Sequence, residues 1–184
     1  ALTLYNNSQY KAAQSLFDDI MYGTDDVTIK SDCSYYIANC AVRLNQNNAD
    51  DLITEFVENY PTSTKRNTAF LDVADYYFNN GKFTYARKWY DKVDELSIAR
   101  SEKDRFNFNY GYSLYSTKSE KQATKYLNRV INSKEYGSQA KYYIGYMAYE
   151  GDDYDTANKY FDQVPFDHFS NRPILGRGKG YKIP

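Results

Sequence analysis

The sequence has few of the residues that most often build catalytic and metal sites. Of its 184 residues, one is histidine and two are cysteine. With His168 alone, neither a histidine-based triad nor a metal cage of paired histidines can form. Cys33 and Cys40 lie seven residues apart in the sequence. That is about 10 Å along a helix, beyond the reach of a disulfide. We therefore expect two buried free thiols, and neither a metal nor a cofactor.

An excess of one charge and long apolar segments are also missing. The chain has 23 basic and 24 acidic residues, for a formal net charge of -1. Neither a basic surface for nucleic acid nor an acidic disordered tail dominates such a composition. The mean hydropathy is -0.80, and the apolar runs are too short to cross a bilayer. The sequence therefore predicts no nucleic-acid partner and no membrane insertion by this segment.

Adjacent acidic residues and one glycine-rich segment are the remaining candidates for chemistry. The adjacent aspartates are Asp18-Asp19, Asp25-Asp26, Asp50-Asp51 and Asp152-Asp153. They lie at the predicted ends of helices, where acidic side chains cap the backbone. The segment GRGKG at 176–180 lacks the spacing and the Lys-Ser/Thr ending of a phosphate-binding loop. The sequence therefore predicts no catalytic residues and no enzyme activity.

What the sequence does contain is tyrosine, with 22 residues, and a recurring segment. The segment YDTANKYFDQV (154–164) shares its spacing with YKAAQSLFDDI (10–20) and FTYARKWYDKV (83–93). In each, an alanine is followed four residues later by Phe or Tyr, which is the spacing of one helical face. The marker positions are Ala13, Leu52, Ala86, Ala123 and Ala157. Their separations of 39, 34, 37 and 34 residues indicate an internal repeat.

A second helix is expected before each of the later markers. A small residue lies twelve positions upstream of three of them, and these residues are Ala74, Gly111 and Gly145. Polar or glycine-bearing turns at 79–81, 116–119 and 151–153 separate the two helices. We expect each marker alanine to pack against the upstream small residue. We expect the following large residue to seal the joint to the next unit; these large residues are Tyr90, Leu127 and Phe161.

These residues resemble the tetratricopeptide repeat, a helix–turn–helix unit of 34 residues. In the third unit the matching residues are Phe70, Val73, Ala74, Tyr77, Gly81, Phe83, Ala86, Tyr90 and Val93. In the fifth they are Ile144, Gly145, Ala148, Gly151, Tyr154, Ala157, Phe161 and Val164. The resemblance implies an all-α fold: a right-handed α-solenoid of antiparallel helix pairs, with about four full units and a partial first one. The units are expected at about 1–22 (partial), 31–60, 64–95, 101–133 and 136–165, followed by an irregular basic tail at 166–184.

A narrower resemblance concerns the junction after the second unit. The segment FVENYPTS at 56–63 is similar to the F-x-x-x-Y-P-x-S junction of bacterial cell-envelope repeat proteins of the BamD and YbgF type. The Tyr- and Asn-rich style around 35–41 is similar to that of large envelope repeat proteins of Bacteroidetes. This resemblance implies a location in the periplasm or cell envelope, with the cytoplasm as the alternative.

Members of the repeat family bind peptides with residues of the first helix of each unit. The positions that correspond in this chain are Asp75, Phe78, Phe108, Tyr112, Tyr115, Tyr142, Tyr146 and Tyr149. The resemblance thus implies an aromatic groove that binds a peptide or protein segment, in a scaffold without catalysis. These positions lack the basic set that the family uses to clamp a terminal carboxylate. The alternative is a structural spacer of a longer array that mainly stacks, or that self-associates through exposed repeat ends.

Overall fold

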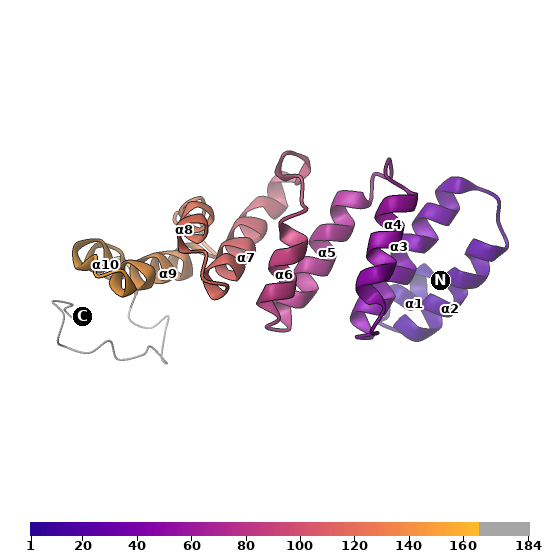
Figure 1. Cartoon of the computed structure of the whole chain (residues 1–184), viewed down its shortest axis with the longest axis horizontal. Coiled ribbons are helices and arrows are strands. Elements are labelled where there is room, and N and C mark those ends of the chain that lie inside the picture. The colour runs from indigo at the N-terminus through magenta and orange to yellow at the C-terminus, as the bar shows by residue number, and fades with distance from the viewer. Residues whose placement is uncertain (166–184) are drawn as a thin grey trace. The chain divides into compact units, whose positions relative to one another are not determined.

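The computed structural model describes residues 1–165, and the chain divides into two compact units, Ala1–Ser97 and Ile98–Pro184. The described residues form ten α-helices and two 3₁₀ turns and contain no strand (Figure 1). This confirms the predicted all-α class. The predicted tail at 166–184 lies outside the described residues.

The first unit contains six of the helices. Their bounds are α1 Leu2–Asn6, α2 Tyr10–Tyr22, α3 Val27–Arg43, α4 Ala49–Asn59, α5 Arg66–Asn79 and α6 Phe83–Tyr90. A 3₁₀ turn, η1 Glu95–Ser97, ends the unit. Each odd-numbered helix packs on the even-numbered helix that follows it, and α3 also packs on α2 and α5. We call the first helix of a pair the A helix and the second the B helix.

The second unit repeats this arrangement. After a 3₁₀ turn, η2 Arg100–Glu102, come α7 Lys103–Ser116, α8 Glu120–Asn128, α9 Gly137–Glu150 and α10 Tyr154–Phe161. The pairs α7–α8 and α9–α10 are in contact, and the A helices α7 and α9 also touch each other. The fold is therefore a repeat of helix pairs, and the A helices α5, α7 and α9 have the same length of 14 residues.

One turn geometry joins all five helix pairs. Each turn contains one residue with φ between 54° and 71°, and these residues are Ser8, Asn45, Gly81, Lys118 and Asp152. The next backbone N–H donates to a carbonyl five residues back, as from Ser119 to Leu114 at 2.9 Å. This is the helix-ending arrangement in which a left-handed residue lets the chain turn back on the last carbonyls. Of the predicted polar or glycine-bearing turns, the one at 79–81 has Gly81 as its left-handed residue. In the last turn the left-handed residue is Asp152 rather than Gly151.

The marker alanines form the centre of the helix pairs. Ala13, Ala86, Ala123 and Ala157 are each fully buried. Leu52, which replaces alanine in α4, is only half-buried, and its neighbour Ile53 is fully buried instead. A leucine at the crossing point is too large for close approach of the helix axes, so α4 presents a different face to its partner.

The packing partners of the small residues differ from the prediction. A Cβ placed on Gly111 would lie 2.9 Å from Cγ of Leu127, and one on Gly145 would lie 3.2 Å from Cε1 of Phe161. Leu127 and Phe161 therefore fill the space over the glycine of their own pair, where the prediction placed Ala123 and Ala157. That they seal the joint to the next unit stays a prediction. Tyr90 likewise reaches back to its own pair, where its hydroxyl donates to Asp75. A large residue fits only because glycine leaves room for it.

Candidate functional site

A surface of tyrosines covers the contact between α7 and α9 in the second unit. Tyr112 and Tyr115 come from α7, and Tyr143 and Tyr146 come from α9. All four side chains are half-buried. The spacing of three residues within each helix places both members of a pair on the same helical face. We call these four residues the tyrosine surface.

The rings of the tyrosine surface contact one another in a continuous network. The ring centroids of Tyr112 and Tyr143 lie 4.8 Å apart at an interplanar angle of 72°. Tyr115 lies 5.2 Å from Tyr143 and 6.3 Å from Tyr146, the latter at 89°. Such edge-to-face contacts stabilise aromatic pairs beyond the burial of their area. The helices therefore hold the rings in fixed positions while part of each ring stays accessible.

Electrostatics at one end of the tyrosine surface are set by Glu150. Glu150 lies one helical turn after Tyr146 on α9, and its side chain is exposed. Burial first, and then the negative charge of Glu150, raises the pKa of both Tyr115 and Tyr146. Burial, followed by the charge of Tyr112 and a hydrogen bond with it, raises the pKa of Tyr143. The phenols thus stay protonated near neutral pH and can donate hydrogen bonds.

Three of the eight sequence-predicted residues belong to this surface: Tyr112, Tyr115 and Tyr146. The sequence reasoning missed Tyr143. Tyr143 lies three residues before Tyr146 and seven before Glu150. That helical spacing on a shared face is the signal that could have found it.

Two predicted residues of the second unit are buried instead of lining a binding surface. Phe108 is 6% exposed and stacks on Tyr136 with centroids 5.0 Å apart. Tyr142 is 8% exposed and packs against Phe161 at 5.7 Å. Their place in the groove is therefore corrected: both rings belong to the core. Tyr149 is half-buried and contacts Tyr154 at 5.9 Å.

The two predicted residues of the first unit contact the B helix of their own pair. Asp75 accepts a hydrogen bond from the Tyr90 hydroxyl, and the Phe78 ring packs edge-on against Phe83 with centroids 5.5 Å apart. Asp75 and Phe78 lie in the first unit, while the other six predicted residues lie in the second. We therefore take the tyrosine surface alone as the candidate site.

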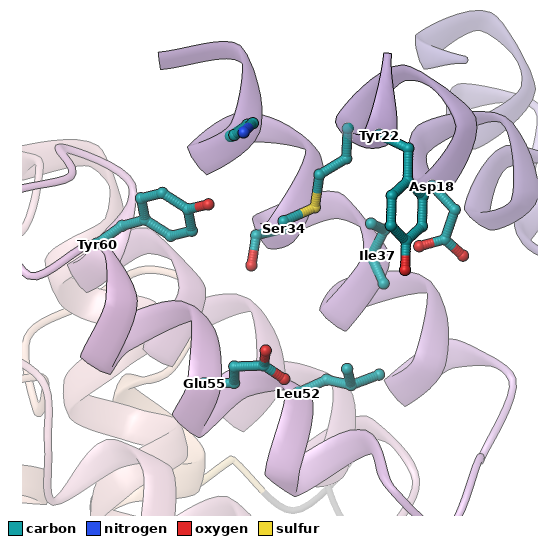
Figure 2. A pocket seen from close by; sticks show the side chains of 9 residues that line it. Asp18, Tyr22, Ser34, Ile37, Leu52, Glu55 and Tyr60 are labelled. Carbon is teal, nitrogen blue, oxygen red and sulfur yellow. The ribbon is translucent and has the colours of Figure 1, made fainter. Parts of the chain in front are cut away.

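A cleft in the first unit is a second candidate. It has a volume of about 470 Å³ and lies among α2, α3 and α4. Figure 2 shows Asp18 and Tyr22 on one side of the opening, and Glu55 and Tyr60 on the other. The remaining lining residues are Met21, Lys30, Ser34, Ile37 and Leu52.

The cleft has the size of a ligand pocket, but three of the residues that line it are charged. Ligand pockets are mostly apolar with a few placed polar groups. Here Asp18, Lys30 and Glu55 are charged, and Tyr22 at the opening is 91% exposed. Burial, and then the neighbouring Asp19, raises the pKa of Asp18, but the groups form no ligand set. The tyrosine surface is the better candidate.

Residues 1–165 contain neither a candidate metal site nor a candidate membrane span. Within them, no three or more His, Cys, Asp or Glu side chains come together in a way that could hold a metal ion. None of the described helices is both long and apolar enough to span a bilayer. His168 lies outside the described residues.

Comparison with known proteins supports the repeat assignment in two segments. The tetratricopeptide repeat model matches residues 32–63 and 139–165. No curated protein matches the chain. A similar solved structure is that of Bacillus thuringiensis PlcR in complex with the peptide PapR7 and DNA. The two chains are 15% identical with a TM-score of 0.49, over 88% of this chain and 67% of that one. The matched segments coincide with α3–α4 and α9–α10, so the predicted resemblance is confirmed for these two helix pairs.

Proposed function

We propose that the chain is a non-catalytic protein-interaction module whose tyrosine surface binds a peptide segment of a partner protein. The observation that carries this proposal is the network of half-buried rings on α7 and α9. Tyrosine supplies a large contact area with few rotatable bonds, so little conformational entropy is lost on binding. The match of α9–α10 to the tetratricopeptide repeat supports the same class of function.

The proposal is tested by selecting a displayed random peptide library on the immobilised full chain. We expect enriched peptides whose binding is lost in the double variant Tyr115→Ala with Tyr146→Ala. A matched control is Tyr22→Ala, because this side chain is 91% exposed and lies in the other unit. Circular dichroism melts of all three proteins show whether the fold is kept. Peptides that bind the double variant as well as the unchanged chain, or the absence of any enriched peptide, would refute the proposal.

A second candidate function, structural stacking, has one observation in its favour. Leu16 and Ile20, one helical turn apart on α2, are 38% and 37% exposed. These two side chains form an exposed apolar strip on α2 that a neighbouring repeat or a second copy would cover. Sedimentation analysis distinguishes the candidates, because stacking predicts a concentration-dependent dimer that Leu16→Lys with Ile20→Lys abolishes.

A periplasmic or cell-envelope location stays a prediction from the junction at 56–63. Fractionation of the source cell, followed by detection of the chain with an antibody, tests it. Recovery in the cytoplasm alone would contradict it.

A further inference from the structure

The first unit contains a built binding site for a basic side chain. Nζ of Lys65 lies 5.6 Å from the ring centroids of both Tyr35 and Tyr36. These two rings are 4.9 Å apart and meet at 72°. The same Nζ lies 3.9 Å from Oδ1 of Asp32. Two angled tyrosine rings and one carboxylate therefore hold one ammonium group, since the ring faces and the carboxylate all attract positive charge.

The second unit presents the same three groups on the tyrosine surface. Tyr115 and Tyr146 have ring centroids 6.3 Å apart and meet at 89°. The exposed Glu150 lies one helical turn after Tyr146 on α9, and its negative charge acts on both phenols. The three groups come from neighbouring A helices, so the helix packing fixes their positions.

The part of the chain that the structure describes supplies no cation to this place. Within residues 1–165, no lysine or arginine lies over the ring of Tyr115 or Tyr146, and none pairs with Glu150. Lys118, the basic residue nearest to Tyr115 in the sequence, is exposed, and its ammonium group lies over neither ring. The arrangement that Lys65 fills in the first unit is thus open to a basic group from elsewhere.

The charge around Tyr115 and Tyr146 also favours a cation. Residues 142–158 contain no lysine or arginine and four acidic residues, namely Glu150, Asp152, Asp153 and Asp155. Because Tyr112 contacts Tyr143 and Tyr115 contacts Tyr146, α7 and α9 run in the same direction. Their carboxyl ends, Ser116 and Glu150, therefore lie near each other. Helix carboxyl ends carry partial negative charge, which adds to that of the carboxylates.

We propose that Tyr115, Tyr146 and Glu150 bind the arginine or lysine side chain of a partner peptide. This inference rests on the proposed function and adds the chemistry of the ligand to it. The rest of the tyrosine surface contacts the neighbouring residues of the peptide, and the cation site fixes its register.

The test uses the peptides selected on the full chain. We expect them to share one arginine or lysine at a fixed position. Replacing that residue by glutamine in the peptide is expected to weaken binding about tenfold, as is Glu150→Gln in the protein. When both substitutions are combined in a double-mutant cycle, the loss of affinity should be smaller than the product of the two single losses. The reason is that either change removes the same interaction. Glu120→Gln on α8 is the matched control, since it removes one exposed negative charge of the same unit.

The outcomes separate this inference from the proposed function. If no peptide is enriched, both fail. If peptides bind through Tyr115 and Tyr146 but share no basic residue, or if the two glutamine substitutions act independently, only the cation site is overturned. The chain's own basic residues at 166–184 are a further occupant to exclude, and they are Arg172, Arg177, Lys179 and Lys182. If basic peptides bind only after these four residues are changed to glutamine, a basic residue of the chain itself occupies the cation site. The proposal that a partner peptide occupies it is then overturned.

Discussion

The hydroxyl of Tyr35 on α3 donates a hydrogen bond to the carboxylate of Asp72 on α5, and this bond joins two consecutive helix pairs. Tyr35 is 5% exposed. Burial first, and then the negative charge of Asp72 and the hydrogen bond to it, raises the pKa of the phenol far above its usual range. The bond exists only while Tyr35 keeps its proton, so the contact between the pairs depends on pH.

The stability of the chain is therefore expected to fall in alkaline solution. The pKa of Tyr35 in the folded state lies above the unfolded value of about 10. Its stabilisation is then fully present below about pH 10 and is lost as the pH rises through the folded-state pKa. Denaturant titrations at a series of pH values should show a smaller alkaline loss for Tyr35→Phe, at a cost of about 1–3 kcal/mol near neutral pH. Tyr22→Phe, at an exposed position, should behave as the unchanged chain, and equal alkaline slopes for all three proteins would contradict the assignment.

Gly111 tests the correction to the packing of the helix pairs. An added methyl group would meet Leu127 at 2.9 Å and its backbone N at 3.2 Å. We expect Gly111→Ala to lower the free energy of unfolding by about 1–3 kcal/mol, although alanine favours a helix. Gly151→Ala is the control, because its Cβ would have only ordinary contacts at 3.4 Å or more. Thermal or urea unfolding measures both, and equal stability of the two variants would rule out the close approach of Leu127.

The shared turn geometry predicts a stabilising substitution. Lys118 has φ of 61°, a left-handed conformation that costs energy for residues with a Cβ. Lys118→Gly should therefore raise the free energy of unfolding by about 0.5–1 kcal/mol. Lys118→Ala, which keeps the Cβ, should give no such gain.

The reverse change, Gly81→Ala, should lower the free energy of unfolding by about 1 kcal/mol. No atom lies within 4 Å of the added Cβ, so only the backbone is strained. Urea unfolding of the three variants is the measurement, and an equal gain for glycine and alanine at 118 would show that the backbone is not strained.

The helices and their pairing could be predicted from the sequence because the marker alanines recur at nearly constant spacing. The residues that pack against each other within a helix pair could not be predicted. The sequence shows that Gly111 is small, but it does not show which side chain fills the space beside it. The same limit applies to the candidate site. The family resemblance pointed to Tyr112, Tyr115 and Tyr146, which are half-buried, and equally to Phe108 and Tyr142, which are also aromatic but are buried. Which tyrosine faces solvent depends on the contact between α7 and α9, and a single helix does not encode that contact.

The two cysteines give a measure of local opening in the first unit. Cys33 and Cys40 are free and buried, as predicted. Burial raises the pKa of both thiols, that of Cys40 to about 11 although the charge of Arg43 opposes the shift. Only about one Cys40 in a thousand is then a thiolate at pH 8, and the thiolate is the reactive form. We expect almost no reaction with an aromatic disulfide reagent in native buffer and two thiols per chain in denaturant.

Single-cysteine variants turn this expectation into a test of the Tyr35–Asp72 contact. Cys33→Ser leaves only Cys40, which lies on the same helix as Tyr35 and is fully buried. If Cys40 reacts by opening of α3, adding Tyr35→Phe should speed its modification by the factor that the lost stability predicts, roughly tenfold for each 1.4 kcal/mol. Lys118→Gly, in the other unit, should leave the rate unchanged. Fast modification of Cys40 in the native Cys33→Ser chain would show that the thiol is accessible without opening, and would contradict its burial.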